Sequence, residues 1–292
     1  MSSKKCYIVS GDIEILLAEW AKQKNFTIPT EDFFVELRLN FSIFTKQIFP
    51  GFRFIPEINF VGIKSLVERT NLTPVSLDRV YYKTKHQLNI TRLVDERGLD
   101  VGLGSRAGAT NIKEQLDLLA NFNLDRIVLV DDVVFSGQQM IEVVDMFGGL
   151  GIQVPTICTS IAIKEGIERL QSKGIDVKSL FTFDEVIDEV CERDFYPGVP
   201  FSGRQLVGSG NIGVPYILPF GNPNKWASIP ESKQIEFSVM CLKQTILLWK
   251  EIGDINNRAL YPQDLPRRII NLSSNKIPIV DQLQNCINVL TR

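Results

Sequence analysis

The sequence predicts a doubly wound α/β fold with a mainly parallel sheet. Ile127 to Val130 is a continuous apolar run of strand length, which is typical of a parallel strand buried on both faces. Helical and extended patterns alternate around it, with helices expected at 109–122, 140–147 and 164–173 and strands at 126–130 and 154–163. A hydrophobic content of 44% and a charged content of 23% are ordinary for a packed globular protein.

Three regions follow from the patterns along the chain. Residues 1–52 read as helical, with one helix around Ile13 to Trp20 and a second from Thr30 towards Pro50. Residues 53–190 form the predicted α/β core, in which 79–82 is rich in β-forming residues. Residues 191–292 form a C-terminal extension with Pro- and Gly-rich loops and a long amphipathic helix at 231–252, which serves either as core or as an oligomer face. The helices of residues 1–52, the region 191–230, or both are candidates for a hood over the ligand.

Composition excludes several classes of protein. The net charge is −2 and no segment gathers Lys and Arg into a dominant patch, which argues against a general nucleic-acid or membrane-surface binder. The apolar stretch near the start is interrupted by Gly11, Asp12 and Glu14, so we expect neither a signal peptide nor a membrane span. We therefore expect a cytoplasmic protein. Five scattered cysteines without a CxxC pair indicate reduced thiols and exclude the common zinc frameworks. One histidine, His86, makes a protein-ligated transition metal improbable, and its polar loop predicts solvation rather than catalysis.

The segment from Asp131 to Gln139 carries the chemistry. In doubly wound sheets, ligands bind outside the carboxyl ends of strands, where Asp131 and Asp132 are expected. Two adjacent carboxylates repel each other and need donors or a cation, which a sugar diol or Mg²⁺ supplies. The following residues lead into a helix whose free amides suit a phosphate. The segment therefore predicts recognition of a ribose phosphate. A purely structural strand-turn-helix and a receiver-type acidic pair are the alternatives.

Val128-Leu129-Val130-Asp131-Asp132-Val133-Val134-Phe135-Ser136-Gly137 resembles the phosphoribosyl-pyrophosphate motif of type I phosphoribosyltransferases. The resemblance implies the doubly wound sheet of that family. It implies that Asp131 and Asp132 hold the ribose hydroxyls as catalytic residues. The residues implied to wrap the 5′-phosphate are Val134, Phe135, Ser136, Gly137, Gln138 and Gln139. By position, Gly62, Ile63 and Lys64 resemble the pyrophosphate loop. The 83–106 stretch resembles a mobile loop in which Lys83 and Lys85 assist catalysis and Arg92 and Arg97 add charge.

The implied reaction transfers the phosphoribosyl group to a nucleobase or other nitrogenous acceptor and releases pyrophosphate. Mg²⁺ would be carried by phosphoribosyl pyrophosphate, with Asp131 and Asp132 near it and without a dedicated protein site. Phe135 and Gln138 depart from the family pattern, which usually has Thr or Asp there. Two alternatives therefore stay open: a non-catalytic nucleotide or phosphoribosyl-pyrophosphate sensor, and a structural subunit with a vestigial pocket. A homo-oligomer or protein partner bound through the C-terminal region is also left open. Residues 193–198 form either a base-recognition wall or a packed turn.

Overall fold

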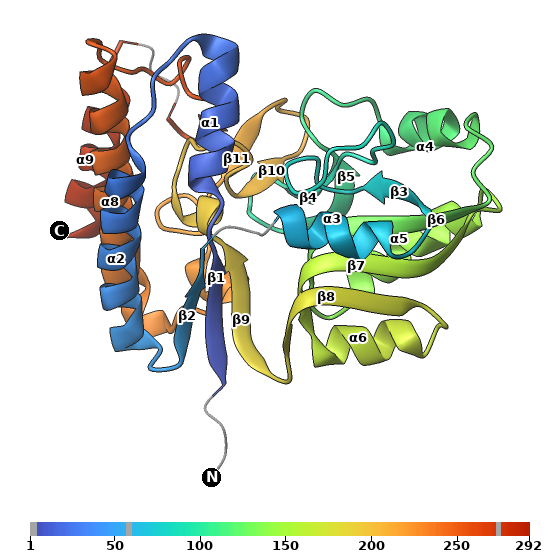
Figure 1. Ribbon diagram of the computed structural model, residues 1–292. Coiled ribbons are helices and arrows are strands. Elements are labelled where there is room, and N and C mark those ends of the chain that lie inside the picture. Colours follow the sequence, from blue (N-terminus) through green and yellow to red (C-terminus); the bar gives the residue numbers. More distant parts are fainter. Residues whose placement is uncertain (1–4, 57–59, 273–275) are drawn as a thin grey trace. The chain divides into compact units, whose positions relative to one another are not determined.

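The computed structural model describes residues 5–56, 60–272 and 276–292 (Figure 1). The chain divides into two compact units, which we describe separately. The first unit comprises Met1–Glu57, Arg92–Gly102 and Ile187–Arg292, and the second comprises Ile58–Thr91 and Leu103–Val186. The regions 1–52 and 191–292, which the sequence treated as separate, both contribute to the first unit.

The second unit is an α/β layer structure around a parallel sheet. Among the described residues the strand order is β3-β6-β7-β8, and neighbouring strands pair in parallel. The strands are β3 (Thr73–Ser76), β6 (Arg126–Val134), β7 (Gln153–Ile163) and β8 (Asp176–Phe183). Ile127 to Val130 of β6 are fully buried, as expected for a central parallel strand. The predicted doubly wound α/β class is confirmed.

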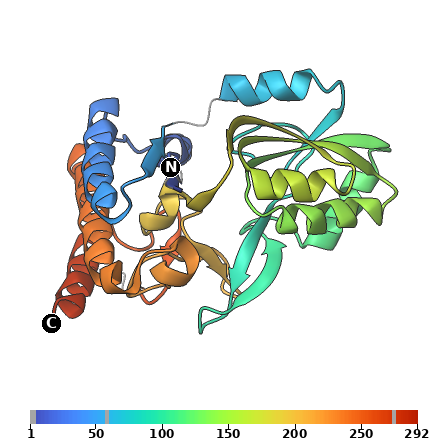
Figure 2. The same ribbon diagram turned by 90° about the horizontal axis from the view of Figure 1, so that it is seen from below.

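Helices cover both faces of this sheet. Helix α3 (Phe60–Glu68) lies on one face, and α5 (Gln138–Gly148) and α6 (Lys164–Gln171) lie on the other (Figure 2). Helix α4 (Ile112–Ala120) precedes β6 and begins at Asn111, whose side chain accepts a hydrogen bond from the Glu114 amide at 2.9 Å. The core between these layers includes Val75, Leu129, Val143, Phe147, Ile157 and Leu170.

Two further sheets consist mainly of residues of the first unit, although β4, β5 and β9 each include residues assigned to the second unit. Strands β1 (Cys6–Ser10), β2 (Phe52–Ile55) and β9 (Val186–Cys191) form one, in the order β2-β1-β9. The other has the order β12-β11-β10-β4-β5 among the described residues. Its members are β4 (Ile90–Val94), β5 (Asp100–Ser105), β10 (Arg204–Leu206), β11 (Ile212–Val214) and β12 (Arg268–Ile269). The 83–106 stretch, expected as a mobile loop, thus contains a pair of strands.

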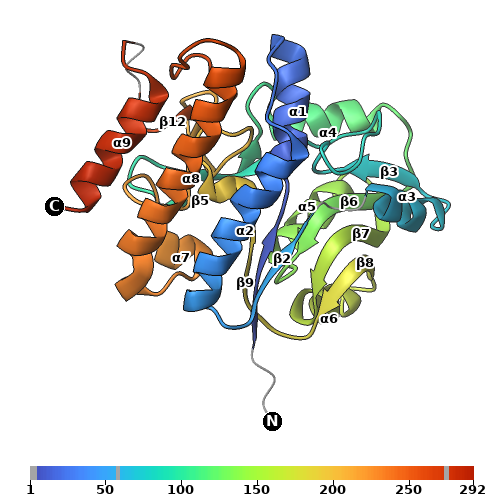
Figure 3. The same cartoon turned by 60° about the vertical axis from the view of Figure 1, so that its left-hand side comes forward.

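Helices and an aromatic core complete the first unit. Helices α2 (Glu31–Ile48), α8 (Gln234–Ile255) and α9 (Ile279–Leu290) lie side by side, with α1 (Ile13–Lys24) nearby (Figure 3). A short helix, α7 (Pro223–Ala227), precedes α8. The rings of Phe41, Phe195 and Phe237 meet with centroids 5.0–6.1 Å apart. The predicted helix at 231–252 is confirmed and its buried residues, such as Trp249, belong to the core.

A turn stands where the sequence predicted a strand at 79–82. The strand is β3, six residues earlier, although it contains Pro74. The Asp78 carboxylate accepts a hydrogen bond from the Val80 amide at 2.9 Å, and its carbonyl accepts bonds from the amides of Tyr81 and Tyr82. Aspartate captures backbone amides in this way in turns, which overrides the β propensity of the residues after it.

No helix in the described part of the chain is both long enough and apolar enough to span a bilayer.

Candidate functional site

The candidate site lies at the carboxyl end of β6. Strand β3 pairs with β6 only as far as Val130, where the Leu77 amide donates to the Val130 carbonyl at 2.9 Å. On its other side β6 stays paired with β7 as far as Val134. Asp131 and Asp132 therefore follow directly after the last pairing with β3, at a step in the edge of the sheet. Both are half-buried.

Negative charge is concentrated at this step. Burial raises the pKa of Asp131 well above its usual value, and the neighbouring carboxylates of Asp132 and Asp78 raise it further. Arg106 acts in the opposite direction on the same pKa. Its guanidinium also lies 3.3 Å from the carboxylate of Asp78, which is 2% exposed. Three carboxylates and the Arg106 guanidinium thus lie close together, an arrangement that favours a ligand offering hydrogen-bond donors.

The backbone around Asp132 is held firmly by its neighbours. The Asp132 side chain accepts a hydrogen bond from the Val133 amide at 2.8 Å, and the Thr159 hydroxyl of β7 donates to the Asp132 carbonyl at 2.7 Å. The position of the acidic pair is therefore set by the central strands of the sheet.

The segment after β6 is a short turn that opens helix α5. Gly137 adopts a left-handed conformation with φ of 76° and precedes the first helical residue, Gln138. The Ser136 hydroxyl accepts a hydrogen bond from the Gln138 backbone amide at 3.4 Å. The amides of the first turn of an eleven-residue helix form an anion site by their orientation. The structure brings this turn next to the acidic pair, as the sequence predicted.

Individual members of the predicted phosphate segment differ in what they offer. Val134 still belongs to β6, pairs with Ala162 and has its side chain in the core, so only its backbone is available. Gln138 is exposed, and its side-chain amide donates a hydrogen bond to the Glu142 carboxylate at 3.5 Å. Phe135 and Gln139 are half-buried. Backbone amides, rather than side chains, dominate the chemistry of this turn.

A glycine of another helix supports the turn from behind. Gly166, in the first turn of α6, packs so closely that a Cβ there would lie 2.3 Å from the Phe135 carbonyl oxygen and 3.1 Å from the Gly137 nitrogen. A Cβ on Gly137 would in turn lie 3.0 Å from the Gly166 carbonyl oxygen. The turn is therefore fixed by contact between two backbones.

Gly62, Ile63 and Lys64 do not form a loop. They lie within α3, where Ile63 and Val67 are buried one turn apart. Lys64 is exposed and its ammonium lies 3.7 Å from the Glu68 carboxylate. The loop prediction is wrong because the apolar residues have helical spacing. The segment that follows β3, beginning at Leu77 and Asp78, is the one that lies beside Asp131.

Lys83 and Lys85 belong to the segment that runs beside β3, where Gln87 bridges Ser76. The Lys85 ammonium lies 5.9 Å from the centre of the Phe122 ring. Lys83 is exposed, and the Thr84 hydroxyl beside it lies 3.4 Å from the Pro74 carbonyl of β3. A catalytic role for these lysines stays a prediction.

His86 is buried, not solvated as expected. It is 3% exposed, and its ring meets Phe122 edge-on with centroids 4.6 Å apart. Burial, followed by the charge of Lys85, lowers its pKa. His86 lies beside β3 because Ser76 and Gln87 form a parallel bridge, which the sequence does not predict.

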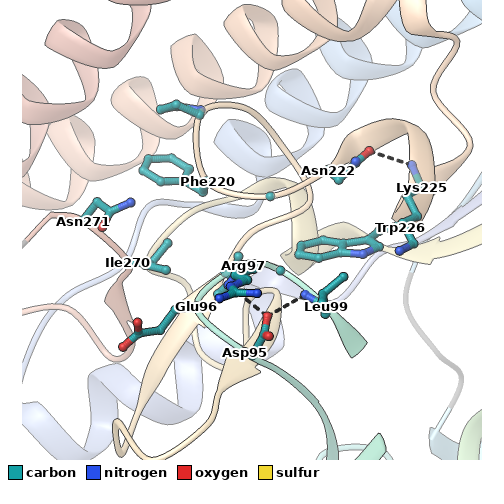
Figure 4. Close-up of a pocket in the computed structure, with 14 residues that line it drawn as sticks. Asp95, Glu96, Arg97, Leu99, Phe220, Asn222, Lys225, Trp226, Ile270 and Asn271 are labelled. Carbon is teal, nitrogen blue, oxygen red and sulfur yellow. Dashed lines mark hydrogen bonds between the residues drawn. The ribbon is translucent and has the colours of Figure 1, made fainter. Parts of the chain in front are cut away.

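A separate pocket lies wholly within the first unit (Figure 4). Its volume is about 450 Å³, and its lining includes Arg97, Phe220, Lys225 and Trp226. The turn that carries Arg97 is closed by Asp95, whose carboxylate accepts bonds from the amides of Arg97 and Leu99 at 2.9 and 2.8 Å (Figure 4). Arg97, predicted to add charge near pyrophosphate, is a lining residue of this pocket.

Sequence reasoning missed Asp78, Arg106 and Gly166. Asp78 and Arg106 are 28 positions apart, and no spacing rule predicts their ion pair. Gly166 was hidden inside a helical pattern, where a glycine is mildly destabilising and so invites a packing reason.

Comparisons with known proteins give structural likenesses only. No protein-family model and no curated sequence matches the chain. One similar structure is orotate phosphoribosyltransferase from Aeropyrum pernix, at 16% identity and a TM-score of 0.25, covering 42% of this chain and 68% of that one. Adenine phosphoribosyltransferase from Thermoanaerobacter pseudethanolicus is 15% identical, with a TM-score of 0.28 and coverage of 42% and 80%. Orotate phosphoribosyltransferase from Mycobacterium tuberculosis in complex with 5-phospho-α-D-ribosyl 1-diphosphate is 10% identical, with a TM-score of 0.27 and coverage of 42% and 70%. The chemistry of the site therefore rests on its own residues.

Proposed function

We propose that the second unit binds the ribose 5-phosphate portion of phosphoribosyl pyrophosphate or of a nucleoside monophosphate. The observation that carries the proposal is the acidic pair at the end of buried strand β6, followed within five residues by left-handed Gly137 and the start of α5. The carboxylates of Asp131 and Asp132 accept hydrogen bonds from the ribose hydroxyls. The amides from Phe135 to Gln139 bind the 5′-phosphate.

The electrostatics of the step support a ligand rich in hydroxyl groups. Asp131 has a raised pKa because it is buried beside two other carboxylates. Hydroxyl donors stabilise the ionised form of a carboxylate and lower its pKa. Binding of a ribose diol should therefore release protons wherever Asp131 is protonated in the free protein, and this release is measurable.

A divalent cation fits the charge of the step but not a dedicated protein cage. The oxygens of Asp131 and Asp132 are of the kind that Mg²⁺ prefers. Among the described residues, no group of three or more His, Cys, Asp and Glu side chains is arranged to hold a metal. We infer that Mg²⁺ would arrive bound to the phosphates of the ligand, near Asp131 and Asp132, and would supply positive charge to the pyrophosphate group.

The activity that follows is phosphoribosyl transfer. A nitrogen of the acceptor attacks the anomeric carbon, the bond from that carbon to the pyrophosphate oxygen breaks, and pyrophosphate leaves with the electron pair. This chain's residues orient the ribose through Asp131 and Asp132 and fix the phosphate through the turn, so their contribution is alignment. Arg106 is the guanidinium already acting on this cluster. The acceptor is a nucleobase or another nitrogenous compound.

A non-catalytic sensor is the second candidate, favoured by Phe135. The Phe135 side chain has no donor for a phosphate and no base for an acceptor. The contact of the Lys85 ammonium with the Phe122 ring also favours this candidate, because it gives this charge a partner other than pyrophosphate. A sensor binds the same ligand with the same carboxylates and amides but releases no pyrophosphate.

Calorimetric titration with phosphoribosyl pyrophosphate, ribose 5-phosphate and AMP, each with and without Mg²⁺, tests binding. Asp131→Asn/Asp132→Asn should weaken binding at least about 100-fold, because each charge-assisted hydrogen bond contributes about 1.5–3 kcal/mol. Asp145→Asn, an exposed carboxylate of α5, is the matched control and should bind like the wild type. Unchanged binding in the double variant would refute the proposed site. Pyrophosphate release with a panel of nitrogenous acceptors then separates enzyme from sensor.

A further inference from the structure

Helix α2 presents apolar side chains on two opposite faces. Phe34, Leu37 and Phe41 are buried in the first unit, at 3% exposure or less. Val35, Leu39 and Ile43 are 56%, 56% and 54% exposed. At about 100° per residue, Val35 and Ile43 lie within about 40° of Leu39 around the helix axis, on the side away from the core. A helix apolar on both faces is normally covered on both.

The other exposed apolar side chains on the helices α8 and α9 do not line up in this way. Ile235 and Leu247 on α8 are twelve positions apart, so they point about 120° away from each other around the helix. Val289 stands near the end of α9. The stripe on α2 is therefore a distinct feature of the helical layer in Figure 3.

Two opposite charges continue the stripe at its ends. Asp32 lies seven positions before Leu39 and Lys46 lies seven positions after it, so both share its face. Both side chains are exposed, and neither forms an ion pair with any residue that the structure describes. Along the helix the stripe reads as acid, three aliphatic residues and base, and it is symmetric in spacing about Leu39.

We propose that α2 is the self-association surface of this protein, where two copies pack antiparallel about a two-fold axis at Leu39. Val35 of one copy then meets Ile43 of the other, and Leu39 meets Leu39. Asp32 of each copy faces Lys46 of the other, which gives two ion pairs. A two-fold interface requires a self-complementary surface, and this stripe is one.

The flanking side chains permit the same arrangement. The two-fold axis places Glu36 opposite Ser42 and Glu31 opposite Gln47, so no like charges face each other. A parallel arrangement in register instead places Asp32 against Asp32 and Lys46 against Lys46. Charge thus selects the antiparallel pairing.

Sedimentation velocity on the full chain, from about 1 to 100 μM, tests the proposal in the range where small interfaces dissociate. The wild type should pass from monomer to dimer with rising concentration. Asp32→Lys and Lys46→Asp should each weaken self-association about tenfold or more, because like charges then face each other. An equimolar mixture of these two variants should form a heterodimer, and the doubly substituted chain should dimerise again. Leu39→Glu should remain monomeric.

Leu247→Glu is the matched control, an equally exposed apolar residue on α8 outside the stripe, and it should dimerise like the wild type. Tryptophan fluorescence verifies folding, because Trp20, Trp226 and Trp249 all belong to the first unit. A wild type that stays monomeric throughout overturns the proposal. So does a dimer that survives Leu39→Glu, or one whose charge variants fail to complement each other.

Discussion

Gly166 gives the sharpest test of how the phosphate turn is held. In Gly166→Ala the added methyl group would lie 2.3 Å from the Phe135 carbonyl oxygen and 2.9 Å from a methyl carbon of Val134. Ordinary contacts are 3.4 Å or longer. Because the nearest neighbour is backbone, either the turn or helix α6 must move by about 1 Å.

The cost divides between stability and binding. Overpacking of this kind destabilises by about 1–3 kcal/mol, which a folded unit can tolerate. A shift of about 1 Å at the turn removes at least one amide–phosphate hydrogen bond, worth about 1.5–3 kcal/mol. The dissociation constant for ribose 5-phosphate should therefore rise about tenfold to 100-fold.

Calorimetry measures the affinity, and hydrogen exchange at the amides of 135–139 reports on the turn even without a ligand. Gly148→Ala is the matched control, since a Cβ at Gly148, the last residue of α5, would meet nothing within 4 Å. If Gly166→Ala binds as tightly as Gly148→Ala and exchanges at the same rates, the contact does not position the turn. If neither variant nor the wild type binds, the proposed function fails while the exchange result still stands.

Three further predictions concern buried charge. Burial, opposed by Arg193, raises the pKa of Asp12 from 3.8 to about 7. Its stabilising contribution is therefore complete below pH 4 and is lost as pH rises through about 7. The loss amounts to about 4 kcal/mol at most, and Asp12→Asn should flatten the pH profile of urea unfolding followed by tryptophan fluorescence. Arg38→Ala should lower the free energy of unfolding of the first unit by about 3–5 kcal/mol in the same assay. The reason is that the Glu192 side chain is 1% exposed and accepts hydrogen bonds from Arg38, so the substitution leaves a buried carboxylate without this partner. A decrease below about 1 kcal/mol would contradict this prediction. Asp131→Asn should raise the melting temperature of the second unit, because it removes repulsion among Asp131, Asp132 and Asp78. The same substitution should weaken ligand binding. A lower melting temperature of the variant in calorimetry would count against repulsion in this cluster.

Local sequence patterns correctly predicted the elements whose structure depends on neighbouring residues alone. The apolar run of β6 and the spacing of α8 each encode their structure within a few residues. The prediction of a strand at 79–82 was wrong because the Asp78 side chain and carbonyl accept hydrogen bonds from the amides of a turn. The prediction of a loop at Gly62–Lys64 was wrong because apolar residues at helical spacing favour a helix in spite of the glycine. The sequence predicted a helical N-terminal region and missed its first strand, β1.

Sequence by itself determined that Asp131 and Asp132 lie towards the carboxyl end of a buried strand and that Gly137 opens a helix, because these are consecutive residues governed by local backbone preference; the strand itself continues to Val134, beyond the predicted end at 130. Tertiary structure decided what surrounds them. Asp78 and Arg106 join the cluster because β3 pairs with β6, and Gly166 supports the turn because α6 packs behind it. Lys85 lies instead beside Phe122, because the chain after β3 turns back before it reaches Gln87. Contacts between residues distant in the chain depend on strand order and helix packing, which no short segment of sequence encodes.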